Sequence, residues 1–366
     1  MYGLYVHLPF CQKKCFYCSF AVCVDMRQID MYLNCLCKEI ANYKGKRIST
    51  IYIGGGTPSI LSERNIDMVV SNIRKNFYID DTKEITIEVN PDSINLFKAR
   101  YLKSIGVNRV SLGIQSLDRK KLEYLGRTHT PEAAILAFDN LREAGFNNIN
   151  VDFIFALPEQ DVADVKKDLT RILFFHPEHV SIYALTIERN SLFFSKGISP
   201  VNDMLQADMY KCAIEMLEEK GIYQYEVSNF ARSGWESQHN INYWMCGDYI
   251  GIGVSAHSHI TGHRYWNMFK IGTYMKNICS KGNAIEAEER LDTYSRFLEA
   301  LLFGLRMNKG VNLVELERRF RCLLDIERQQ ILEGFVENGF LYKSKGYLKT
   351  TFRGRLILDE LCNRLI

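Results

Sequence analysis

The chain has 366 residues, of which 47% are hydrophobic and 24% are charged, and its formal net charge is +3. These proportions are typical of a soluble globular protein and argue against a disordered chain, and the length suits one large domain or a large domain with a smaller one. The small positive excess does not indicate a surface that binds nucleic acid or an anionic membrane, because such binding needs many clustered cations.

The amino-terminal residues lack the basic flank and the apolar run of a signal peptide. No other segment approaches the roughly 20 apolar residues that a membrane span needs. We therefore expect a cytoplasmic protein without a transmembrane segment. In a reducing compartment, its 11 cysteines are expected to bind metal, to act in catalysis or to lie buried rather than to form disulfides.

Short runs of β-branched and aromatic residues alternate with amphipathic segments from the amino terminus onward. The runs predict strands at residues 2–8, 50–53, 85–89, 109–114, 150–155, 180–185 and 222–227. The amphipathic segments predict helices at residues 26–43, 62–74, 93–104, 131–144 and 162–174. Thr130 can cap the fourth of these helices and Gly145 can end it. The alternation indicates an α/β fold with a parallel sheet, closed into a barrel or open, that binds ligands at the carboxyl ends of its strands.

The pattern changes near Glu286, where helix-rich sequence begins. Helices are predicted at residues 294–305, 313–320 and 326–336, and short strands around Leu341 and Tyr347. We therefore expect a larger domain over residues 1–285 and a small helical or winged-helix-like domain over residues 286–366. Basic residues only slightly outnumber acidic ones in this last part, so a packing or lid role is favoured over DNA binding.

Three cysteines, Cys11, Cys15 and Cys18, follow the first predicted strand directly. Their thiolates would meet in one loop at a strand's carboxyl end, and three protein thiolates on an iron-sulfur cubane leave one iron open for another ligand. A structural zinc site is the competing interpretation. Zinc normally takes four ligands in two pairs, and Cys23 could supply the fourth.

Several further motifs resemble the radical S-adenosylmethionine (SAM) superfamily, in the branch of HemN and HemW. They are YVHLPFC at residues 5–11, GGGTPS at 54–59, EVNP at 88–91, SLGIQS at 111–116, LGR at 125–127, Asp152 in its strand, and FALP at 155–158. The resemblance covers nearly the whole chain. It implies a partial (β/α)6 barrel followed by the C-terminal domain of this branch.

The resemblance also implies the cofactors and the residues that hold them. Cys11, Cys15 and Cys18 would bind a 4Fe-4S cluster, the amino and carboxylate groups of SAM would bind the open iron, and an electron from the cluster would cleave the sulfonium. Carboxylates suit ribose hydroxyls or an ammonium group, and arginine suits a carboxylate. The residues assigned to SAM are Gly55, Gly56 and Thr57 at its methionyl end, with Glu88, Gln115, Arg127 and Asp152; Tyr5 and Tyr17 would pack beside the cluster.

Two other patterns are weaker. The spacing Gly251-x-Gly253-x-x-Ala256 fits a dinucleotide fingerprint loosely, but no βαβ unit surrounds it, so we discount it. A second pattern has a spacing that could suit zinc, although ordinary polar or porphyrin-facing histidines are favoured; it consists of His257, His259 and His263.

The position of the chain within the branch depends on two features. The porphyrinogen-decarboxylating oxidases have a longer amino-terminal segment and a further cysteine where this chain has Phe20. The run HNINYW at residues 239–244 resembles the HN-x-x-Y-W motif of the HemW heme chaperones, which implies that His239 and Tyr243 contact heme. In an alternative interpretation, His239 only forms hydrogen bonds in a loop and Tyr243 is a core residue.

The leading hypothesis is a heme chaperone that delivers heme to an apo-cytochrome and takes electrons from a donor such as a flavodoxin or ferredoxin. An oxygen-independent coproporphyrinogen III oxidase is the first alternative, and Phe20 argues against it. A metal-stabilised interaction module without SAM chemistry is the second.

Overall fold

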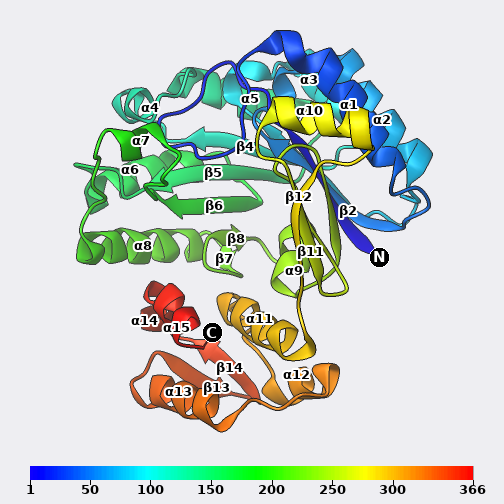
Figure 1. Cartoon of the computed structure of the whole chain (residues 1–366). Helices are drawn as coiled ribbons and strands as arrows, with labels where there is room; N and C mark the ends of the chain where they lie inside the picture. Colours follow the sequence, from blue (N-terminus) through cyan, green and yellow to red (C-terminus); the bar gives the residue numbers. More distant parts are fainter. Residues whose placement is uncertain (366) are drawn as a thin grey trace.

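Six parallel strands form the centre of the computed structural model, which describes residues 1–365 (Figure 1). They lie side by side in chain order, and each pairs in parallel with the next. The strands are β1 Tyr2–Leu8, β2 Ile48–Gly55, β3 Glu84–Val89, β4 Arg109–Gln115, β5 Ile149–Phe155 and β6 His179–Ala184. The predicted α/β class and the predicted parallel sheet are confirmed, and the sheet is an open, partial barrel.

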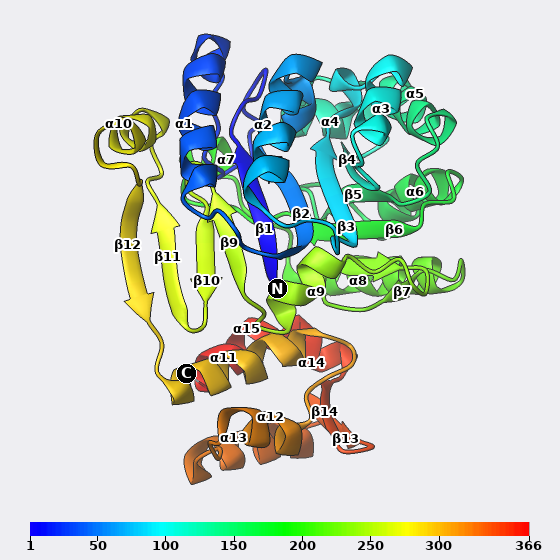
Figure 2. The ribbon, with the colours of Figure 1, turned by 90° about the vertical axis from the view of Figure 1, so that its right-hand side faces the viewer.

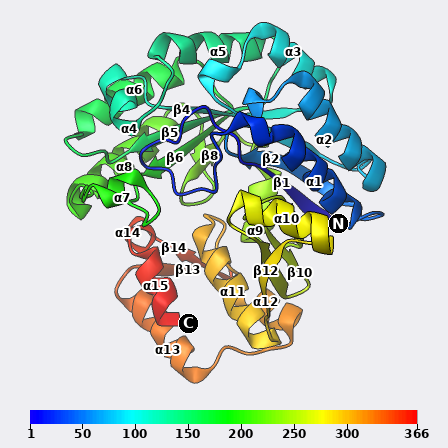
Figure 3. The ribbon, with the colours of Figure 1, turned by 45° about the horizontal axis from the view of Figure 1, so that its top comes forward.

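Helices cover the outer face of these strands, as a view onto the sheet from above shows (Figure 3). They are α1 Ile29–Ala41, α2 Glu63–Asn76, α3 Leu96–Ser104, α4 Arg119–Leu125, α5 Pro131–Glu143 and α6 Val162–Leu173, with the 3-10 turns η1 Met26–Gln28, η2 Pro58–Ile60 and η3 Pro91–Ser93. The predicted ends of α5 are confirmed, because the Thr130 side chain accepts from the N–H of Ala133 and Gly145 has a φ of +87°. Leucine, isoleucine, valine and phenylalanine side chains from both layers form one large core.

The sheet continues beyond β1 into a hairpin extension that the sequence did not predict (Figure 2). Strand β9 Tyr249–Ile252 pairs in parallel with β1, and β10 His257–Ile260, β11 His263–Asn267 and β12 Ile285–Arg290 follow in antiparallel order. Helix α10 Ile271–Lys281 packs against α1. Since β12 belongs to the large sheet, the chain stays in that sheet up to Arg290, past the expected boundary at residues 285–286.

The other end of the sheet also differs from the prediction. The run expected as one strand at residues 222–227 contains only the short strand β7 Tyr223–Gln224, which pairs with β8 Asn229–Ala231; β8 in turn pairs antiparallel with β6. Three helices in this part of the chain were not predicted: α7 Leu192–Ser195, α8 Asp203–Glu218 and α9 Gln238–Trp244.

The last part of the chain forms a second hydrophobic core of its own, made by residues from Phe297 to Leu365. Its elements are α11 Thr293–Arg306, α12 Leu313–Phe320, α13 Ile326–Glu337, the hairpin of β13 Leu341–Ser344 and β14 Tyr347–Thr350, and the helices α14 Phe352–Leu356 and α15 Leu358–Leu365. Helices followed by a short hairpin are the arrangement that the sequence predicts. Within residues 1–365, no helix is long and apolar enough to cross a membrane.

Candidate cofactor site

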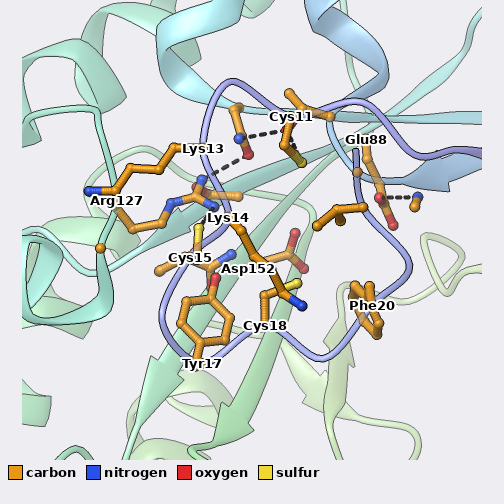
Figure 4. A pocket seen from close by; sticks show the side chains of 18 of the residues that line it. Cys11, Lys13, Lys14, Cys15, Tyr17, Cys18, Phe20, Glu88, Arg127 and Asp152 are labelled. Atoms are coloured by element: carbon orange, nitrogen blue, oxygen red, sulfur yellow. Dashed lines mark hydrogen bonds between the residues drawn. The ribbon is translucent and has the colours of Figure 1, made fainter. Parts of the chain in front are cut away.

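A cavity of about 490 Å³ opens at the carboxyl ends of the six parallel strands. Its wall includes most of the residues that the sequence assigns to the cluster and SAM, and the side chains labelled in Figure 4 surround one space. These residues are Cys11, Cys15, Tyr17, Cys18, Gly55, Gly56, Thr57, Glu88, Gln115, Arg127 and Asp152. Parallel strands place their carboxyl ends at one edge of a sheet, which explains why residues so far apart in the sequence meet here.

The three cysteines lie on a loop that begins where β1 ends. Two backbone hydrogen bonds close the base of this loop: the N–H of Cys11 donates to Cys23 O at 3.0 Å, and the N–H of Cys23 donates to Pro9 O at 2.7 Å. Inside the loop, the N–H of Cys18 donates to Cys15 O at 3.2 Å. All three cysteines line the cavity, and because they are only half-buried, solvent can reach them.

The surroundings of these thiols suit an iron-sulfur cluster. Burial raises the pKa of Cys11 to about 11 and also raises the pKa of Cys18, and nearby Cys15 raises both further. The guanidinium of Arg127 donates to Cys15 Sγ at 3.7 Å. A cluster supplies the positive charge that stabilises three neighbouring thiolates.

The thiols do not converge on one point. Among residues 1–365, no three His, Cys, Asp or Glu side chains stand close enough to share a single metal ion. In a cubane cluster each cysteine binds a different iron, so its ligands surround the cluster instead of meeting at one ion. Cys23, the candidate fourth ligand for zinc, is buried below the loop and does not line the cavity.

The glycines after β2 bring two segments of backbone into close contact. Gly55 has a φ of +114°, and a Cβ there would lie 2.7 Å from the His7 ring. A Cβ on Gly56 would lie 2.7 Å from the backbone of Pro9 and Phe10. These glycines therefore let the start of the cysteine loop pack against the end of β2, in addition to lining the cavity.

Glu88 is held in place by two donors. The hydroxyl of Tyr52 donates to Oε1 at 2.9 Å, and the N–H of Gly55 donates to Oε2 at 3.0 Å. Burial nevertheless raises the pKa of Glu88 to about 7, and the carboxylate of Asp152 raises it further. A ligand that brings positive charge or hydroxyl donors would stabilise the ionised form of this carboxylate.

Gln115 has a backbone conformation that is rare for its residue type. Its φ is +66°, at the end of β4 where the pairing with β5 shifts register. Its buried Oε1 has no hydrogen-bond partner within residues 1–365. A strained residue with an unpartnered amide oxygen in a cavity wall is expected where a ligand supplies the missing donor.

Arg127 and Asp152 both line this cavity. Nη2 of Arg127 donates to Asn90 Oδ1 and to Gly113 O, both at 2.8 Å. Asp152 accepts from the hydroxyl of Ser111 at 3.0 Å and from Asn150 Nδ2 at 2.8 Å, and burial raises its pKa. Arg127, Glu88 and Asp152 therefore border a space that can hold a ligand with both carboxylate and ammonium groups.

Asn90 is a site residue that the sequence did not single out. Its amide donates to Thr57 Oγ1 at 3.0 Å and accepts from Arg127, so it links the glycine segment to the arginine. The signal was present, because Asn90 belongs to the EVNP run at residues 88–91. Phe20 also lines the cavity and is 63% exposed, and thus an aromatic ring stands at the mouth.

Three assigned residues lie outside the cavity wall. Tyr5 sits deeper between the strands, where its hydroxyl bonds His7 Nδ1 at 2.9 Å. His239 and Tyr243 lie on α9, beneath the opposite end of the barrel (Figure 2). The structure thus does not bring the HNINYW motif to the cysteines.

His239 is buried and both of its ring nitrogens have partners. Nδ1 bonds Thr50 Oγ1 at 2.8 Å, Nε2 bonds Tyr243 OH at 2.8 Å, and the ring stacks on Tyr52. Burial lowers the pKa of His239 to about 3. Thr50 lies near the start of its strand, so this histidine marks the amino end of the barrel, and in this arrangement its nitrogens are not free to bind iron.

The two weaker sequence patterns form no site. Gly253 is followed by the hairpin of β10 and β11 and not by a helix, which agrees with discounting a dinucleotide fingerprint. In the histidine pattern, His257 stacks on Trp266, while His263 pairs with Glu288 at 3.0 Å. His263 pairs in register with the residue after His259, and it therefore points to the other face of the sheet.

The comparisons with known proteins agree with this geometry. The model of the radical SAM superfamily matches residues 5–172. The heme chaperone HemW of Bacillus subtilis is 33% identical over 99% of this chain and 98% of its own length, and that of Escherichia coli is 32% identical over 98% of this chain and 96% of its own. The solved structure of coproporphyrinogen III oxidase (HemN) from Escherichia coli, a radical SAM enzyme, has a TM-score of 0.89 and 25% identity, covering 99% of this chain and 89% of that one. The chain belongs to the radical SAM superfamily, in the branch that contains the HemW heme chaperones and HemN.

Proposed function

We propose that this chain is a heme chaperone that holds a 4Fe-4S cluster and SAM in the cavity and passes heme to an apo-hemoprotein such as an apo-cytochrome. The observation that carries the proposal is the match to HemW relatives along nearly the whole chain, together with a cavity in which three cysteines and the SAM-directed side chains meet.

The cavity residues that the sequence assigns to the cluster and to SAM each have a role in this proposal. Cys11, Cys15 and Cys18 bind the cluster, and Tyr17 packs beside it. Arg127 faces the carboxylate of SAM, while Glu88 accepts from its ammonium or hydroxyl groups. The remaining contacts to SAM come from Gly55, Gly56, Thr57, Gln115 and Asp152. When bound, the cluster supplies an electron, which a flavodoxin or ferredoxin would deliver.

The heme part of the proposal rests on the relatives. HemW proteins are named as heme chaperones, and HemN as an oxidase of a porphyrin precursor. His239 could bind heme iron only after giving up one of its two ring hydrogen bonds, so its assignment as a ligand needs α9 to rearrange. The cofactor cavity is open in this structure, so binding there does not require α9 to move.

An oxygen-independent coproporphyrinogen III oxidase is the second candidate, because the whole chain superposes on such an enzyme with a TM-score of 0.89. Phe20 occupies the position at which those oxidases have a further cysteine, and this difference disfavours the oxidase activity. An interaction module without SAM chemistry would load iron but bind no SAM.

One anaerobic preparation can separate these functions. The chain is reconstituted with iron and sulfide, then tested for SAM binding, titrated with heme and assayed with coproporphyrinogen III. We expect the cluster chromophore, SAM binding and saturable heme binding without release of carbon dioxide. Carbon dioxide release would establish the oxidase instead, and an iron-loaded chain that binds neither SAM nor heme would overturn the proposal.

A further inference from the structure

A second cavity, of about 320 Å³, lies where the barrel meets the C-terminal domain. One wall comes from the end of β5, from β6, from α8 and from the loop before β8; the other comes from the end of α11 and from α14 and α15 (Figure 1). Apolar side chains and two guanidinium groups share this lining. A ligand here would touch both domains at once.

The second cavity adjoins the cofactor cavity. Tyr183, Ala184 and Thr186, at and after the end of β6, line both of them. Tyr183 is 42% exposed although its strand is paired on both sides, and it lies where the two cavities adjoin. A ligand larger than either cavity could therefore occupy parts of both.

The two arginines of the second cavity differ in how they are partnered. Arg306 is committed: its Nε donates to the fully buried Glu226 at 2.8 Å, and its guanidinium lies 4.5 Å from the centre of the Trp244 ring. Arg355 donates from Nη1 to the amide oxygen of Asn308 at 2.6 Å. Its Nε is buried without a hydrogen-bond partner, and within residues 1–365 no carboxylate lies within ion-pair distance of it.

Arg355 therefore offers a donor and an unneutralised charge. Leaving a buried N–H without an acceptor is costly, and a guanidinium is best matched by a carboxylate. The exposed acid Asp359 lines the same cavity but does not pair with Arg355. Of the apolar side chains in the lining, Leu356 is exposed, whereas Phe155 and Ile182 are almost fully buried behind it.

We propose that the second cavity binds a carboxylate arm of a tetrapyrrole, with Arg355 as the group that recognises it. The flat ring system would lie between the exposed side chains of Leu356 and Tyr183, and heme has two carboxylate arms, its propionates. This inference rests on the proposed function, since it specifies how heme would be held.

The test compares heme with its dimethyl ester, in which the propionates carry no charge. Both are titrated into the reconstituted full-length chain and into Arg355→Gln. The unaltered chain is expected to bind heme about tenfold more tightly than the ester, because a charged hydrogen bond is lost in the ester. Arg355→Gln is expected to bind both ligands equally. A preference for heme that survives in Arg355→Gln would overturn the inference.

Two further variants guard against a general loss of structure. Arg353→Gln removes the same charge from the same short helix, where Arg353 is exposed and stacks on Phe340, and it should keep the preference for heme. Asp359→Asn removes the acid beside Arg355 and should strengthen heme binding. Loss of the preference in Arg353→Gln, or weaker binding in Asp359→Asn, would count against Arg355. Absence of any heme binding by the unaltered chain would instead refute the proposed function.

Discussion

The two ends of the barrel are both lined with polar groups, but they use them differently. At the carboxyl end, Gln115 has an unpartnered oxygen and a strained backbone, and three thiols face an open cavity. At the amino end, His239 has partners on both nitrogens, and Glu84 accepts from Ser237 and from the N–H groups of Gln238 and His239. An unpartnered polar group in the wall of an open cavity indicates a ligand site, whereas the satisfied network around His239 indicates a structural role.

The largest expected effect is at the carboxyl end of the barrel, which contains the open cavity. Cys15→Ala should abolish the cluster, because two thiolates cannot hold a cubane. Iron content and the brown absorbance after anaerobic reconstitution measure this loss. Cys212→Ala, a buried cysteine on α8 away from the cavity, is the control and should load normally. A Cys15→Ala chain with full iron content would show that the loop is not the cluster site.

The substitution His239→Ala tests the hydrogen-bond network at the amino end of the barrel. It should lower the free energy of unfolding by about 2 to 4 kcal/mol, since it leaves a void and removes partners from two buried hydroxyls. Denaturant unfolding measures the loss, and the exposed His257→Ala should change stability by less than about 1 kcal/mol. Heme titration of the refolded variant tests the ligand assignment separately: unchanged heme affinity would remove His239 as a ligand. Unchanged stability would instead contradict the structural role.

A pH titration of SAM binding tests the role of Glu88 at the carboxyl end of the barrel. Burial raises the pKa of Glu88 to about 7, and in the proposed role its ionised form would accept hydrogen bonds from SAM. At one pH unit below the pKa only about a tenth of the carboxylate is ionised, so affinity should fall roughly tenfold between pH 8 and pH 6. Glu88→Gln should flatten this dependence, and an equal slope in that variant would assign it to another group. Because the folded pKa is raised, Glu88 also makes the SAM-free chain less stable as the pH rises through 7.

The smallest effect concerns the strained backbone. Gln115→Gly should change the free energy of unfolding by less than about 1 kcal/mol, because relief of the positive φ offsets the greater freedom of glycine in the unfolded chain. It should still weaken SAM binding, since the amide is lost. Glu159→Gly alters a second non-glycine residue with a positive φ, 63°, that does not line the cavity, and it should leave SAM affinity unchanged. Equal SAM affinity in both variants would refute a role for Gln115.

The carboxyl end of the barrel could be predicted from the sequence far better than the amino end. The cysteine spacing and the strands at residues 2–8 and 109–114 place the cavity residues at neighbouring strand ends, because parallel topology leaves little choice. The surroundings of His239 depend instead on contacts between α9 and strands nearly 190 residues away in the sequence, such as the bond to Thr50. The strand β12 escaped prediction for a similar reason: it is short, acidic and mostly exposed, and its pairing with β11 defines it.

The base of the cysteine loop has a consequence for how the protein matures. Its two backbone bonds, at Cys11 and Cys23, need no metal, and Ala21 and Cys23 of the loop pack into the core of the barrel. We expect the scaffold to fold before iron arrives and the assembly machinery to reach the half-exposed thiols from outside. Damage by oxygen would then strip the cluster and leave a chain that can be repaired by refilling, without synthesis of a new one.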